Sequence, residues 1–226
     1  MTEAELRRAV IATARSMNAL GINQGASGNV SARVGGHMLI TPSGVPYEAL
    51  TPKAIAKLAF DGDGGWTGPL KPSSEWRFHL DILRARPEAG AVVHTHAVHC
   101  AAFSMLREPL RATHYMIAMF GGPDVRCTSY APYGTPELSA LAVEGLRGRT
   151  AVLLGNHGMI TIGRDLDEAL SRAVELETLA KQTFIASQMG KPVLLSDEEV
   201  MRVVERFKGY GANAQVKAPR RRGSVA

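Results

Sequence analysis

The sequence is poor in cysteine and has no long apolar run. Its 226 residues include two cysteines, Cys100 and Cys127, which do not form a Cys-x-x-Cys pair. A disulfide scaffold is therefore excluded, and a zinc site built on cysteine is disfavoured. Apolar runs such as residues 151–154 are far too short to cross a bilayer, so we expect no membrane contact. Residues 1–5 are acidic where a secretory signal would be basic and then apolar, which predicts a cytoplasmic protein.

The excess of positive charge is confined to one end of the chain. The formal net charge is +5, and residues 217–226 hold one lysine, three arginines and no acidic residue. The rest of the chain is therefore almost neutral, whereas a nucleic-acid-binding protein needs a basic face on the fold itself. We expect no binding to nucleic acid. We predict a single domain over residues 1–216, followed by a basic, disordered tail over residues 217–226.

Apolar residues make up 45% of the chain and charged residues 21%, a balance typical of globular proteins. Hydrophobic periodicity and capping residues predict helices over 2–20, 73–86, 97–105, 135–146, 165–189 and 196–208. Strands are predicted over 30–34, 38–41, 91–95, 150–154 and 159–162, and a surface loop over 61–72. This alternation indicates one α/β domain, but the pattern alone does not separate a doubly wound parallel sheet from an antiparallel one.

Three histidines are the strongest candidates for chemistry. His94-Thr95-His96 follows a strand-like apolar run, and alternate residues of a strand share a face, so the two rings can share one metal ion. His157 lies between two glycines in a tight loop joining two predicted strands, and it would complete a three-histidine set with an open coordination position. The same spacing also has an explanation without metal. His94 and His96 would then be buried histidines bonded to the backbone, and His157 an ordinary turn residue. The other four histidines have no partner pattern and are expected at the surface or as satisfied core residues: His37, His79, His99 and His114.

Three short segments have the features of an anion-binding site. Ser73-Ser74-Glu75 begins a predicted helix, where free N–H groups, the helix dipole and two hydroxyls favour a phosphate. Gly28-Asn29 and Ser43-Gly44 are turns whose backbone N–H groups can face an anion. Ordinary capping and turn chemistry accounts for each segment taken singly. The chain has no Walker A motif, no Gly-x-Gly-x-x-Gly and no Gly-x-Ser-x-Gly.

Taken together, these segments resemble a known family. Five motifs stand in the order of the class II aldolase/adducin family: Gly28-Asn29, Thr41-Pro42-Ser43-Gly44, Ser73-Ser74-Glu75, His94-Thr95-His96 and Asn156-His157-Gly158. The resemblance runs from the first helix to residues 207–210 and leaves out only the basic tail. It is closest to the branch of the L-fuculose-1-phosphate aldolases and the related 5-deoxyribulose and 5-(methylthio)ribulose 1-phosphate aldolases.

The resemblance implies a fold and an activity. The fold is expected to be a three-layer α/β/α sandwich around a mainly antiparallel sheet, and the assembly a homotetramer with active sites at subunit contacts. The expected reaction is the reversible cleavage of a phosphorylated ketose substrate, namely a ketose 1-phosphate, which gives dihydroxyacetone phosphate and an aldehyde. The alternatives are another phosphosugar enzyme of the family, namely a dehydratase, a 4-epimerase or a decarboxylase, and a non-catalytic adducin-like binding module.

The resemblance also implies roles for individual residues. One Zn²⁺ per subunit, replaceable by Mn²⁺ or Co²⁺, is expected on His94, His96 and His157, with Glu75 as a resting ligand and acid/base. Tyr115 is expected to reach the neighbouring subunit's site as a proton donor, although a packed aromatic residue explains it equally well. The expected phosphate-binding residues are Gly28, Asn29, Ser43, Gly44, Ser73 and Ser74. The expected aldehyde pocket is Tyr133, Phe207 and Tyr210, with Tyr133 in place of the phenylalanine of the fuculose enzymes.

Overall fold

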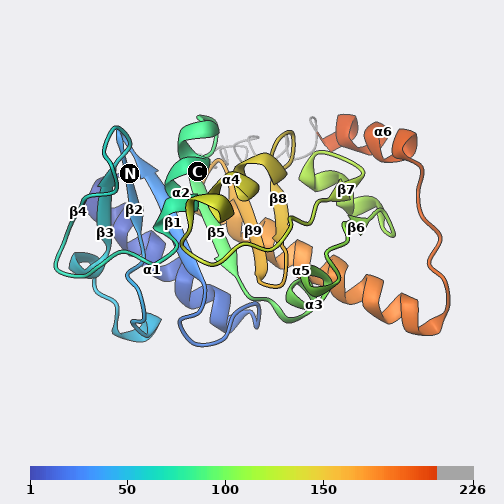
Figure 1. Cartoon of the computed structure of the whole chain (residues 1–226), viewed down its shortest axis with the longest axis horizontal. Coiled ribbons are helices and arrows are strands. Elements are labelled where there is room, and N and C mark those ends of the chain that lie inside the picture. The colour runs from blue at the N-terminus through green and yellow to red at the C-terminus, as the bar shows by residue number, and fades with distance from the viewer. Residues whose placement is uncertain (208–226) are drawn as a thin grey trace, which may run out of the picture.

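The computed structural model describes residues 1–207, and the predicted basic tail and Tyr210 lie outside them (Figure 1). The helices are α1 (Glu3–Ala19), α2 (Trp76–Ala85), α3 (Val98–Leu106), α4 (Pro136–Gly145), α5 (Leu166–Met189) and α6 (Asp197–Phe207). The strands of the main sheet are β1 (Asn29–Val34), β2 (His37–Ile40), β3 (Ala56–Ala59), β4 (Trp66–Thr67), β5 (Ala91–Thr95), β8 (Ala151–Leu154) and β9 (Gly158–Gly163). Smaller elements are β6 (Leu110–Arg111), β7 (Asp124–Val125), η1 (Tyr47–Ala49), η2 (Pro52–Ala54) and η3 (Tyr115–Phe120). No helix of the described residues is both long enough and apolar enough to span a membrane.

The main sheet has seven strands in the order β4-β3-β2-β1-β5-β9-β8, and every neighbouring pair is antiparallel. Its two faces carry separate hydrophobic clusters. One cluster packs α1, α3 and α5 on one face, and the other packs α2 and α4 on the opposite face. Strand β5 contributes to both, because Val93 belongs to the first cluster and Val92 to the second. The three-layer α/β/α sandwich is confirmed, and a doubly wound parallel sheet is excluded.

Capping residues define most helix ends as predicted. Thr2 and Glu5 form both bonds of a capping box at the start of α1, and Gly21, with φ of 72°, follows its last turn. Thr135 caps α4 with Pro136 at the first helical position, and Asp165 caps α5. These local bonds involve residues at most three positions apart, so the sequence alone is sufficient to locate them.

The start of α2 and the region before it differ from the prediction. The second helix begins at Trp76 rather than at Ser73 or Ser74. The backbone N–H of Ser73 donates to the carbonyl of Thr41, which holds the chain extended beside the turn of residues 41–44. Strand β3 and the two short 3-10 helices were not predicted, and β4 lies within the predicted loop. The site described next depends on this late helix start, because it leaves Glu75 at the N-cap position.

Candidate active site

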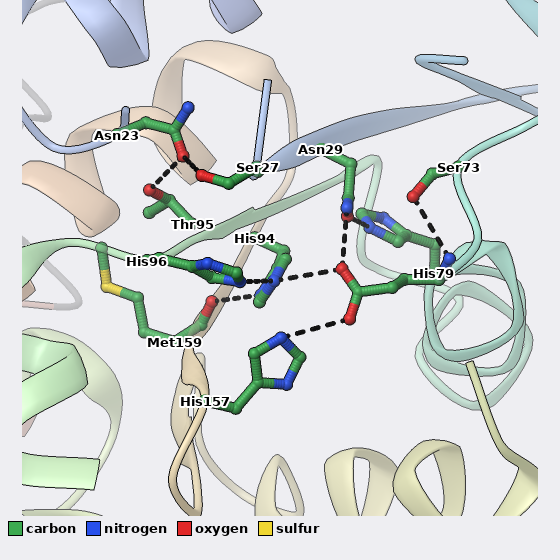
Figure 2. A network of polar contacts seen from close by, with 12 residues as sticks. Asn23, Ser27, Asn29, Ser73, His79, His94, Thr95, His96, His157 and Met159 are labelled. Carbon is green, nitrogen blue, oxygen red and sulfur yellow. Dashed lines mark hydrogen bonds and ion pairs between the residues drawn. The ribbon is translucent and has the colours of Figure 1, made fainter. Parts of the chain in front are cut away.

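Three histidines converge at one end of the sheet (Figure 2). His94 belongs to β5 and His96 follows it, while His157 lies in the loop between β8 and β9. Strands β5 and β9 pair directly, with His94 opposite Ile160, which brings the loop to the end of β5. One ring nitrogen from each histidine lies within 4.8 Å of the other two. These three side chains can therefore hold one metal ion.

The hydrogen bonds of His94 fix which nitrogen faces its neighbours. Its Nδ1 lies 2.9 Å from the carbonyl oxygen of Met159, which can only accept. When the ring is neutral, as in a metal ligand, its proton therefore belongs on Nδ1, and the lone pair of Nε2 points to Nε2 of His96, 3.1 Å away. An imidazole that donates one N–H to a carbonyl and offers the other nitrogen is the usual arrangement of a metal ligand.

Helix α3 holds the loop that carries His157. The buried Ser104 accepts the N–H of Asn156 with its carbonyl, at 3.0 Å, and the N–H of His157 with its hydroxyl, at 3.1 Å. Asn156 and Arg107 are the two non-glycine residues with positive φ in the described part of the chain, each at 55°, and Arg107 Nε donates to Asn156 Oδ1 at 2.7 Å. Such backbone conformations concentrate where a fold holds a functional group in place.

Glu75 lies against the histidines in a buried position. Its Oε2 is 3.2 Å from His94 Nε2 and accepts a hydrogen bond from Asn29 Nδ2 at 2.9 Å. Its Oε1 is 3.3 Å from His157 Nε2 and has no hydrogen-bonding partner among the described residues, although it is buried. A buried carboxylate oxygen without a partner is unfavourable unless a cation compensates for it. Three imidazoles and one carboxylate with this unpaired oxygen fit a divalent metal ion such as zinc.

Burial and neighbouring charges set the protonation of these groups. Burial raises the pKa of Glu75, but His94, His157 and the amide of Asn29 more than offset this, so its pKa lies below the usual range. Burial, together with the neighbouring His94, lowers the pKa of His96 and the pKa of His157 to about 4 each. Both rings are therefore neutral near pH 7, which is the form that binds a metal.

Two networks anchor the site on opposite faces of β5 (Figure 2). Thr95 points away from the histidines and donates to Asn23 Oδ1 at 3.1 Å, which also accepts the hydroxyl of Ser27 at 3.2 Å. On the histidine side, the fully buried His79 bonds to the side chains of Asn29 and Ser31. His79 is the satisfied core residue that the sequence predicts, but its connection to the site was not foreseen.

The buried state of His79 predicts a pH dependence of stability. Burial lowers its pKa from 6.5 to about 3, so between these values the unfolded chain binds a proton that the folded chain does not. Stability is therefore lost as the pH falls below 6.5. Between pH 7 and pH 4.5 this group alone should reduce the free energy of unfolding of the metal-free protein by about 2–3 kcal/mol. Urea unfolding in EDTA at several pH values measures it, and His79→Gln should show a dependence weaker by that amount. The same dependence of the unfolding free energy on pH in the wild type and in His79→Gln would contradict the prediction.

Among the predicted phosphate-binding residues, Gly28 adjoins His94, and Asn29 and Ser73 contact Glu75. A Cβ on Gly28 would come within 2.6 Å of the carbonyl oxygen of His94, so only glycine fits there. Gly44 has a φ of 68°, and Ser43 and Ser74 are exposed. The N–H groups of Ser43 and Ser73 are donated to backbone carbonyls, which leaves their hydroxyls as the groups that can meet an anion. The hydroxyl of Ser73, which is buried, also accepts the N–H of Glu75 at 3.2 Å.

A cavity of about 370 Å³ opens over the histidines. It includes Tyr133, which was predicted from the resemblance, and Tyr130 and Ser27, which were not identified from the sequence. Both tyrosines are more than half exposed and stand at its mouth. The full lining is Ser27, Ser74, Glu75, His96, Tyr130, Ala131, Tyr133, Asn156 and His157.

Two other predicted site residues lie away from the cavity over the histidines. Tyr115 and Phe207 line a separate cavity of about 460 Å³ between η3 and α6, and neither lines the cavity over the histidines. Tyr115 is 50% exposed, so it is not a packed core residue. Within one chain the fold does not bring it to His94, and its predicted role in a neighbouring subunit stays a prediction. Tyr210 falls outside the described residues.

Comparison with known proteins gives consistent matches. The family model "Class II Aldolase and Adducin N-terminal domain" matches residues 8–184. The chain is 49% identical to the 5-methylthioribulose-1-phosphate/5-deoxyribulose-1-phosphate aldolase of Rhodospirillum rubrum, over 95% of the chain and 96% of that protein. It is 47% identical to the L-fuculose phosphate aldolase of Escherichia coli K12, over 93% of the chain and 98% of that protein. A solved L-fuculose 1-phosphate aldolase superposes with a TM-score of 0.88 at 36% identity, covering 92% of this chain and 98% of that one.

Proposed function

The chain belongs to the class II aldolase and adducin family, and we propose that it is a metal-dependent aldolase that cleaves a ketose 1-phosphate to dihydroxyacetone phosphate and an aldehyde. The observation that carries the proposal is the convergence of His94, His96, His157 and Glu75, the last three of which line an open cavity. The two relatives described above are aldolases acting on substrates of this class.

The chemistry requires charge stabilisation and a mobile proton. Breaking the C3–C4 bond of a ketose 1-phosphate leaves negative charge on the dihydroxyacetone phosphate half. A divalent ion, which we propose to be one Zn²⁺ per subunit with Mn²⁺ or Co²⁺ as substitutes, supplies positive charge for this carbanion. His94, His96 and His157 would hold it. We assign the acid/base role to Glu75. As a carboxylate it takes up the proton that the C4 hydroxyl releases when the C3–C4 bond breaks and the aldehyde forms, and it returns that proton to C3 of the dihydroxyacetone phosphate half; the reverse reaction moves the proton the opposite way.

We place the phosphate of the substrate at the two turns beside Glu75. Pro42 and Pro72 form a bridge that sets the turn of Ser43-Gly44 next to Ser73-Ser74. Ser74 lines the cavity over the histidines, and Gly28 follows the loop that contributes Ser27 to the same cavity. These small residues leave room for a phosphate and offer hydroxyl and backbone donors to it. Tyr133, at the mouth of the cavity, is then placed for the aldehyde half.

We propose that the enzyme is a homotetramer with active sites at subunit contacts. In Figure 1, α5 extends past the sheet and the chain returns as α6, so this end of the fold projects beyond the sheet. The outer surfaces of α3 and α5 expose large apolar side chains, a feature typical of subunit interfaces. These are Val98, Met105, Leu106, Phe184 and Ile185. An interface here would let Tyr115 and Phe207 complete the site of a neighbouring subunit, and light scattering on the purified protein measures the assembly.

A coupled assay tests the proposed reaction. The zinc-loaded protein is expected to release dihydroxyacetone phosphate from at least one of L-fuculose 1-phosphate, 5-deoxyribulose 1-phosphate and 5-(methylthio)ribulose 1-phosphate. EDTA should abolish the release, and added zinc should restore it, because the charge that stabilises the carbanion is removed and returned with the metal.

The negative outcomes separate the alternatives. Stoichiometric metal without release of dihydroxyacetone phosphate from any of the three substrates would overturn the aldolase and favour a dehydratase, an epimerase or a decarboxylase. A protein purified without chelator that holds no stoichiometric metal would favour a non-catalytic binding module.

A further inference from the structure

We propose that His79 is a positioning residue that fixes the carboxylate of Glu75 through the side chain of Asn29. The inference rests on the acid/base role proposed above for Glu75. His79 lies one helical turn after Glu75, on α2, and is completely buried. Its Nε2 is 2.5 Å from Asn29 Oδ1 and its Nδ1 is 2.7 Å from Ser31 Oγ. Asn29 Nδ2 completes the connection at 2.9 Å from Glu75 Oε2.

The hydrogen atoms of this network have one consistent arrangement. The amide of Asn29 donates to Oε2 of Glu75 at 2.9 Å, because a carboxylate oxygen can only accept. This orientation turns Oδ1 of Asn29 toward His79, and an amide oxygen can only accept, so Nε2 of His79 carries the hydrogen. The neutral ring then has its lone pair on Nδ1, and the hydroxyl of Ser31 donates to it. Ser31, His79 and Asn29 thus donate in sequence toward the carboxylate.

The network distinguishes the two oxygens of Glu75. Oε2 is held by Asn29, whereas Oε1 has no hydrogen-bonding partner among the described residues and faces His157. Fixing one oxygen also fixes the rotation of the carboxylate group, so the same oxygen always faces His157. Both polar atoms of the Asn29 side chain are engaged in this way. Its amide therefore orients the carboxylate, and the phosphate is left to the neighbouring turn residues.

Three substitutions of His79 separate positioning from packing. In glutamine, the amide nitrogen reaches the place of Nε2 and can still donate to Asn29, whereas asparagine is too short and leucine has no donor. We expect His79→Gln to keep kcat within about threefold of the wild type, and His79→Asn and His79→Leu to lower kcat by about 10–100-fold, the usual effect of losing a partner of a site residue. The KM for the best of the three ketose phosphates and the inhibition by inorganic phosphate should not change.

A second readout isolates the proton step. Exchange of a carbon-bound hydrogen of dihydroxyacetone phosphate with deuterium from the solvent, followed by NMR without aldehyde, should fall in parallel with kcat in His79→Asn. A residue with a merely structural role would lower stability in the glutamine and asparagine variants alike. Equal kcat values in these two variants, or a loss expressed in KM or in phosphate inhibition, would overturn the proposal.

Two further measurements do not depend on these outcomes. If His79→Asn does not fold, Ser31→Ala keeps the ring and removes the group that fixes its tautomer, and it should lower kcat by about 3–10-fold at unchanged KM, a smaller loss than for direct removal of the donor. If the wild type cleaves none of the three substrates, the function proposed above fails, but crystal structures of the two His79 variants still test the positioning. Glu75 should keep its contact with Asn29 in His79→Gln and lose it in His79→Asn. A carboxylate of Glu75 in the same position as in the wild type in both variants would contradict the inference.

Discussion

Replacing His94 with alanine is expected to remove the bound metal and the aldolase activity together. The ring of His94 lies between the other ligands, with Nε2 at 3.1 Å from His96 and 3.2 Å from Glu75, and its other nitrogen is fixed by Met159. Without it, two imidazoles remain, and the carboxylate of Glu75 is needed for the proton step, so the ion loses one of the three permanent protein ligands that a catalytic zinc site uses. Loss of a residue that hydrogen-bonds to a metal ligand lowers activity by about 10–100-fold. Loss of the ligand itself should lower the activity by more than that.

Metal content by mass spectrometry and the coupled assay measure the two losses on the same sample. His37→Ala, at the start of β2 and away from the cavity, is the matched control and should keep both. A His94→Ala protein that retained one metal ion per chain and normal turnover would contradict the metal centre described here.

Substitution of Glu75 by glutamine should separate metal binding from catalysis. Glutamine has the same shape, and its amide oxygen can still accept from Asn29, so the fold and the three imidazole ligands stay in place. It cannot take up and return a proton, and the loss of a general acid/base group lowers turnover by about 10²–10⁴-fold. We therefore expect an unchanged metal content with almost no release of dihydroxyacetone phosphate.

Glu144→Gln supplies the control for this substitution. Glu144 is exposed on α4, pairs with Arg147 and does not line the cavity over the histidines, so its replacement should leave kcat unchanged. Near-normal turnover in Glu75→Gln would remove Glu75 from the acid/base role and transfer the proton step to another group.

The sequence was informative wherever a feature depends on nearby residues. Thr2, Thr135 and Asp165 cap helices through bonds to residues three positions ahead, so these helix starts were predicted. The alternation of a strand likewise placed His94 and His96 on one face. The late start of α2 was not predictable in this way, because the bond from Ser73 to Thr41 competes with helix formation and joins segments about 30 residues apart.

The site was predictable only in part, for the same physical reason. The ligand set followed from short motifs and from the resemblance to a family, and the structure brings those residues together. His79 gave no signal beyond its position one turn after Glu75, because its partners Asn29 and Ser31 come from a strand 48–50 residues earlier. Tyr130 was missed because its place at the cavity is set by a long loop rather than by a periodic element.

The pairing of β5 with its two neighbours limits how the length of this chain can change. Asn29 lies opposite His94 in β1, and Ile160 lies opposite it in β9, so the groups around the carboxylate sit in adjacent rows of one sheet. Inserting or deleting a single residue within β1 or β5 would turn the following side chains of that strand to the other face and break the pairing that sets Asn29 opposite His94. The loop of residues 60–65, between β3 and the edge strand β4, has no such constraint. Length variation among homologous enzymes is therefore expected at that edge of the sheet, while its central strands keep a constant length.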